Sequence, residues 1–78
     1  MTTRLPRVRG REVVQALVRG GFYLSHVRGS HHYLRKAGAT ALVVVPVHGS
    51  RVIPLGTLIS ILRQAGLSPA EFQELLNR

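Results

Sequence analysis

The chain contains no cysteine, only three acidic residues and a single lysine. Without thiols it can form neither a disulfide nor a thiolate–metal bond, and it has no cysteine nucleophile. Long hydrophobic runs are also missing, because the longest, residues 41–47, is far shorter than the roughly 20 residues of a membrane-spanning helix. An N-terminal apolar core of the kind found in signal peptides is absent too. We therefore expect a cytoplasmic protein that neither enters nor crosses a membrane.

The 78 residues leave room for one domain with one modest core. A hydrophobic fraction of 45% provides enough apolar surface to offset the entropy lost on folding. We expect a single domain over residues 1–78. Residues 1–9 are polar and basic around Pro6, so we expect them to form a flexible arm.

Positive charge is concentrated in the first three quarters of the chain. The formal net charge is +8, and residues 1–63 hold ten cations and one acid, Glu12. All cations but Lys36 are arginines, which bind phosphate through two nitrogens at once and stack on bases. This bias favours a nucleic-acid partner. The alternative is a solvated basic face in a protein from an arginine-rich proteome.

Hydrophobic spacing predicts three helices and three strands. Residues 10–19 have a one-sided apolar stripe that ends at Gly20-Gly21, and a second stripe runs from Leu58 to Ala65. Between them, residues 22–27, 30–35 and 41–45 alternate or are rich in β-branched side chains, and tight turns separate them. Ser68-Pro69-Ala70-Glu71 has the pattern of a capping box and predicts a short terminal helix.

This order predicts an α+β fold, α-β-β-β-α, with a three-stranded antiparallel sheet, helices packed on one of its faces and a short C-terminal helix added. It is the layout of the double-stranded-RNA-binding domain. In such a fold the opposite face of the sheet and the loops are left for ligands. Fold alone does not decide function.

Five short blocks occur in a fixed order along nearly the whole chain. They are Gly20-Gly21-Phe22, Gly29-Ser30-His31-His32-Tyr33, Val45-Pro46-Val47-His48, Pro54-Leu55-Gly56-Thr57-Leu58 and Ile61-Leu62-Arg63-Gln64-Ala65-Gly66-Leu67. With these blocks the sequence resembles the HicA toxin family, small messenger-RNA-cleaving components of bacterial toxin–antitoxin pairs. The resemblance implies an endoribonuclease that needs no metal or other cofactor, and a HicB-type antitoxin as its partner.

The resemblance also implies that His31, the first histidine of the Gly-Ser-His block, is catalytic. RNA cleavage needs a base for the ribose 2′-hydroxyl and an acid for the leaving 5′-oxygen, and an imidazole can serve as either. We take His48 as the candidate for the second group, because it closely follows the third strand and could approach the second strand across the end of the sheet. The residues that we expect to bind RNA are Arg28, Gly29, Ser30, Arg35 and Arg51.

Each of these residues also has a plainer interpretation. Without the family resemblance, His31 would be an ordinary exposed strand residue, and His48 could simply cap its loop. Tyr23 and Tyr33 could stack on bases, although packing in the sheet is the simpler interpretation. Zinc binding is disfavoured, because no histidine pair has the i, i+4 spacing of helical ligands. A second function also remains open, that of an RNA-binding module of the same fold that cuts nothing.

Overall fold

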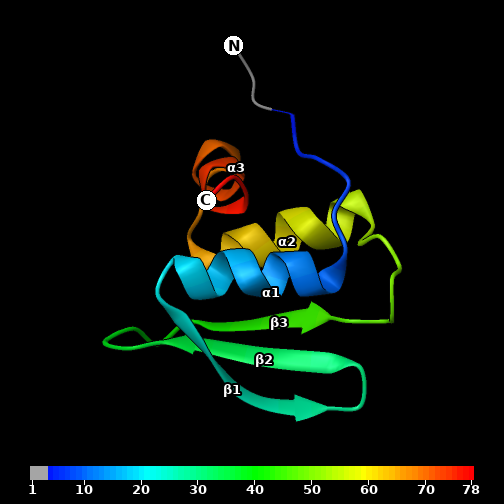
Figure 1. Cartoon of the computed structure of the whole chain (residues 1–78). Coiled ribbons are helices and arrows are strands. Elements are labelled where there is room, and N and C mark those ends of the chain that lie inside the picture. Colours follow the sequence, from blue (N-terminus) through cyan, green and yellow to red (C-terminus); the bar gives the residue numbers. More distant parts are fainter. Residues whose placement is uncertain (1–3) are drawn as a thin grey trace.

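The computed structural model describes residues 4–78 and contains three helices and three strands in the predicted order (Figure 1). The α+β arrangement expected from the sequence is confirmed. The elements are α1 (Gly10–Arg19), β1 (Phe22–Arg28), β2 (His31–Lys36), β3 (Leu42–Pro46), α2 (Leu55–Ala65) and α3 (Pro69–Leu76).

The three strands form one antiparallel sheet in the order β1-β2-β3. Leu34 of β2 lies opposite Leu24 of β1 and Val43 of β3, and this row points toward the helices. Because strand side chains alternate between faces, Tyr33 and its partner Val44 point the other way. We call this second side of the sheet the open face, since no element in the described part of the chain covers it (Figure 1).

A β-bulge between Leu24 and His26 changes the face on which the second half of β1 presents its side chains. Strict alternation from Phe22 would have put His26 on the helix side, beside Leu24. A bulge inserts one extra residue into one strand, so the alternation shifts by one position. His26 therefore lies opposite Tyr33 on the open face, and Val27 lies opposite His32 on the helix side.

Helices α1 and α2 lie on one face of the sheet, and α3 packs against α1 (Figure 1). The side chain of Arg19 donates a hydrogen bond to the carbonyl oxygen of Leu75 at 3.1 Å and so joins the end of α1 to α3. The capping box predicted for α3 is present. Glu71 N–H donates to Ser68 Oγ at 3.1 Å, and Ser68 N–H donates to Glu71 Oε1 at 2.8 Å.

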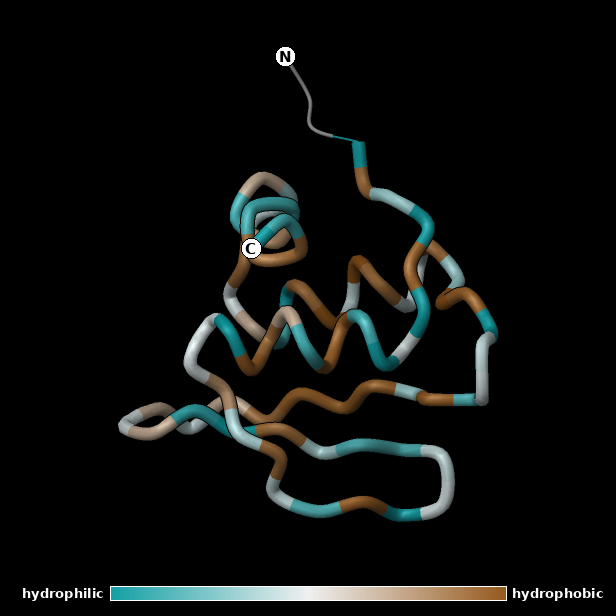
Figure 2. Tube along the Cα trace, viewed as in Figure 1, coloured by the Kyte–Doolittle hydropathy of each residue, from teal (hydrophilic) through white to brown (hydrophobic). Residues whose placement is uncertain are grey.

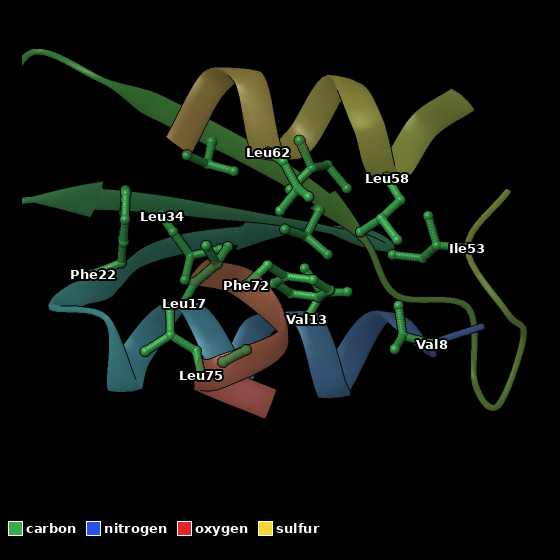
Figure 3. Packing of buried hydrophobic residues seen from close by; sticks show 14 residues of the cluster. Val8, Val13, Leu17, Phe22, Leu34, Ile53, Leu58, Leu62, Phe72 and Leu75 are labelled. Atoms are coloured by element: carbon green, nitrogen blue, oxygen red, sulfur yellow. The ribbon is translucent and has the colours of Figure 1, made fainter. Parts of the chain in front are cut away.

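The core lies between the sheet and the helices and receives side chains from all six elements (Figure 3). Phe72 of α3 and Leu17 of α1 are fully buried, and so is Leu34 in the middle strand. Colouring by hydropathy shows an almost continuously apolar β3, whereas β1 mixes apolar and polar residues and β2 is mostly hydrophilic (Figure 2). Burial of β3 fixes the position of the strand that precedes His48.

Part of the N-terminal segment is folded against the domain. Val8 is buried, its carbonyl oxygen accepts a hydrogen bond from Ile53 N–H at 2.8 Å, and Arg9 forms a β-bridge with Val52. These contacts hold Val8 and Arg9, the last two residues of the range 1–9 over which we expected a flexible arm, against the domain. Residues 1–3 of that range lie outside the described residues.

The cap of α3 makes stability depend on pH. The Ser68 amide and hydroxyl hold the pKa of Glu71 below its ordinary value of 4.5, because their hydrogen bonds favour the ionised carboxylate. A carboxyl group whose pKa is lowered by folding stabilises the folded state at pH values above its pKa in the unfolded chain. This stabilisation is lost as the pH falls through the pKa of the folded state. Glu71→Gln should therefore flatten the fall in the free energy of unfolding below about pH 4.5.

Urea unfolding at pH 7 and at acidic pH checks this, with Glu74→Gln as the matched control on the same helix. Equal acid sensitivity of wild type and Glu71→Gln would show that the cap is not the source.

Candidate active site

A two-residue turn places His31 at the start of β2. Arg28 and His31 form the last pair of the β1–β2 ladder, and Gly29 and Ser30 connect them. Gly29 has a φ of 54°, while no other type of residue in the described chain has a positive φ. This pattern is typical of a type II′ hairpin turn, which needs glycine at its first position. The glycine therefore fixes the register that brings Arg28 beside His31.

His31 is exposed on the open face, between two neighbours from the flanking strands. It lies opposite Arg28 of β1 and Pro46 of β3, and paired residues of a sheet point to the same face. Adjacent strands are about 4.8 Å apart, so a phosphate that approached the imidazole would also be within reach of the long Arg28 side chain.

His48 lies against the residue that precedes His31. Val47 N–H donates to the carbonyl oxygen of Ser30 at 2.7 Å, which extends the β2–β3 pairing beyond Pro46. The ring nitrogen Nε2 of His48 then lies 3.3 Å from Ser30 Oγ, at hydrogen-bonding distance. His48 thus approaches the second strand across the end of the sheet, as expected from the sequence, and the residue that it contacts there is Ser30.

A cavity of about 460 Å³ adjoins this end of the sheet. His48 and Arg51 line it from the loop, and Thr57 lines it from the first turn of α2. Pro46 belongs both to the cavity wall and to the row of His31. The open face and the cavity therefore meet at Pro46, with one histidine on each side of it and an arginine near each histidine.

The loop that carries His48 is held by the N-terminal segment, a contact that sequence patterns did not reveal. Arg9 Nε donates to the carbonyl oxygen of Ser50 at 3.1 Å. Gly10, the first residue of α1, is buried so tightly that a Cβ there would clash with the Pro46 carbonyl oxygen and lie 2.9 Å from Val47 Cα. The one available signal was a glycine at the start of a helix, and this alone does not indicate what it packs against.

The expected RNA-binding residues do not all gather at this end. Arg28, Gly29 and Ser30 surround His31, and Arg51 shares the cavity with His48. Arg35 lies opposite Tyr23 and Leu42, four residues along β2 from His31 and therefore about 13 Å away along the strand. Arg35 is on the same open face but outside the immediate surroundings of the two histidines.

His32 faces the helices, because strand side chains alternate and His31 faces the other way, and it lies in a row with Val27 and Val45. Its Nδ1 atom is buried and has no hydrogen-bond partner among the described residues. Within residues 4–78, no three or more histidine, cysteine or acidic side chains lie close enough together to hold a metal ion.

The sequence itself connects this geometry to known proteins. A family model described as the HicA toxin of bacterial toxin–antitoxin systems matches residues 10–67, from the start of α1 to just past the end of α2. The chain belongs to the HicA toxin family. The resemblance seen in the five sequence blocks is therefore confirmed. A comparison with curated proteins found no match.

Membership of the HicA family gives the chain the role of a toxin and implies a cognate antitoxin. The matched range contains all seven residues that were singled out from the sequence, namely His31, His48, Arg28, Gly29, Ser30, Arg35 and Arg51. None of the helices described here is both long and apolar enough to cross a membrane.

The close packing of Gly10 predicts a specific effect on the site. Gly10→Ala should destabilise the fold by about 1–3 kcal/mol, because the new methyl group must push the backbone at Pro46 and Val47 away. Gly56→Ala is the matched control: its Cβ would meet nothing within 4 Å, and alanine favours a helix by up to about 1 kcal/mol.

Urea unfolding measures both free energies, and amide NMR shifts of Val47 and His48 report displacement of the loop. If Gly10→Ala moved neither quantity relative to Gly56→Ala, the assigned contact would be wrong.

Proposed function

We propose that this HicA toxin is an endoribonuclease that cleaves messenger RNA, with His31 as its general acid or base. The observation that carries the proposal is the exposed imidazole of His31 beside Arg28, with His48 bound to the adjoining Ser30. Two imidazoles at one end of a sheet, each near an arginine, provide the groups that RNA cleavage by internal attack requires.

In the proposed reaction one histidine removes the proton from a ribose 2′-hydroxyl, and the 2′-oxygen attacks the adjacent phosphorus. The bond from phosphorus to the 5′-oxygen breaks, and the second histidine donates a proton to that oxygen. The products are a 2′,3′-cyclic phosphate and a 5′-hydroxyl. Arg28 and Arg51 would stabilise the negative charge that develops on the phosphate oxygens. His31 and His48 are the proposed pair, in either order of roles.

The antitoxin partner would be a HicB-type protein that masks this end of the sheet. A net charge of +8 favours an acidic partner, because opposite charges steer association and fix orientation. Such a partner could block RNA simply by covering His31, which no described element of the chain itself covers. Cytoplasmic location follows as a proposal from the messenger RNA substrate.

A binding module that docks on RNA without cutting it is the second candidate function. The basic charge favours it as strongly as it favours a nuclease, since phosphate binding needs no acid–base group. The two functions differ in what they require of His31.

His31→Ala should abolish cleavage while changing the free energy of RNA binding by less than about 1 kcal/mol, a small share of a multi-phosphate interface. Induced wild type should arrest growth and degrade RNA, whereas His31→Ala at matched protein levels should do neither. Ser60→Ala, at an exposed position on α2, serves as the folded control and should behave as wild type. Absence of RNA decay with both proteins would favour the binding module, whereas equal decay by wild type and His31→Ala would exclude His31 as the general acid or base.

A further inference from the structure

The open face of the sheet consists of three cross-strand rows, and the last of them contains His31. Each row takes one residue from each strand, in register. The rows are Tyr23, Arg35 and Leu42, then His26, Tyr33 and Val44, and finally Arg28, His31 and Pro46. Successive rows are two residues apart along β2, or about 6.5 Å, so the three rows extend over about 13 Å.

Two of the three rings on this face, those of Tyr23 and His26, are exposed, and that of Tyr33 is half-buried. Tyr23 is 51% exposed, and its hydroxyl has no hydrogen bond to another described residue that would account for its position. His26 and Tyr33 stack with their ring centroids 4.3 Å apart and an angle of 8° between planes. Each of the two rings therefore has one face against the other ring and a second face that this contact leaves open. The simpler sequence interpretation, in which both tyrosines pack inside the sheet, is wrong for Tyr23.

The charge of the face has a single sign. Arg35 stands in the first row and Arg28 in the last, whereas the chain's three acids lie on the helices: Glu12 on α1, Glu71 and Glu74 on α3. A flat surface with exposed rings between arginines complements a polyanion whose bases are free to stack. Arginine can bind the phosphates, and each ring offers a π-face that accepts any base.

We propose that the open face is a stacking platform for single-stranded RNA, on which Tyr23 and the His26–Tyr33 pair hold bases and align the strand with His31. This rests on the proposed ribonuclease function and adds a substrate-binding site to it. Unpaired RNA is the occupant that fits, because bases in a duplex are already stacked on each other and cannot open onto a flat sheet. A layout typical of duplex-binding domains would thus bind single strands through the sheet.

The test measures equilibrium binding of a short 2′-O-methyl RNA of mixed sequence, which cannot undergo attack by the 2′-oxygen and therefore stays intact. Tyr23→Ala should raise the Kd by about 5- to 150-fold, the range for loss of one base–aromatic stack. Tyr23→Phe, which keeps the ring, should bind as wild type does. Val18→Ala removes exposed apolar surface from α1 and is the matched control, with no expected change.

Two further arms make the proposal specific. Tyr23→Leu retains an apolar strand residue without a π-face and should weaken binding as Tyr23→Ala does, even if the alanine variant folds poorly. The same RNA annealed to its complement should bind more weakly than the single strand, and its Kd should not respond to Tyr23→Ala.

Equal Kd values for wild type, Tyr23→Ala and Tyr23→Leu would overturn the platform. Tighter binding of the duplex than of the single strand would overturn it too. So would a Tyr23→Ala variant that lost affinity only for the cognate antitoxin, because the face would then be a protein-docking surface. Cleavage of unmodified RNA by wild type and His31→Ala, assayed in parallel, tests the proposed nuclease separately. A protein that never cleaves but still needs the Tyr23 ring for binding would refute the nuclease and keep the platform.

Discussion

The pairing of β2 with β3 is the constraint on which the rest of the site depends. Val43 and Val45 are fully buried under the helices, and this burial fixes β3 against the core. The β2–β3 register then places Pro46 opposite His31, and the Val47–Ser30 hydrogen bond brings His48 to the neighbouring residue. A slip of one residue would turn His31 toward the helices and change the pairing that brings His48 to Ser30.

Much of this could be predicted from the sequence, because it depends on local patterns. The stop at Gly20-Gly21, the turn at Gly29 and the capping box at Ser68 each have short-range causes, and the elements begin and end near them. The opposite orientations of His31 and His32 follow from strand alternation alone. The contact between His48 and Ser30 was anticipated only as an approach across the sheet end.

What the sequence did not reveal depends on non-local packing. The bulge after Leu24 has no glycine to mark it, and it moves His26 to the open face, where the ring meets Tyr33. The anchoring of Val8 by Ile53 joins segments about half the chain apart. Both features bear on function. The bulge completes the row of His26, Tyr33 and Val44, which neighbours the row of His31, and the Val8–Ile53 contact holds the end of the loop that carries His48.

The chemical identity of the new RNA ends tests the central claim, histidine acid–base cleavage at this end of the sheet, most directly. Purified toxin would be incubated with a defined RNA in the presence of a chelator, and the product termini would be identified by mass spectrometry. The account predicts 2′,3′-cyclic phosphate and 5′-hydroxyl ends, since the 2′-oxygen is the nucleophile. Ends with a 3′-hydroxyl and a 5′-phosphate, or cleavage that stops when the chelator is added, would contradict it.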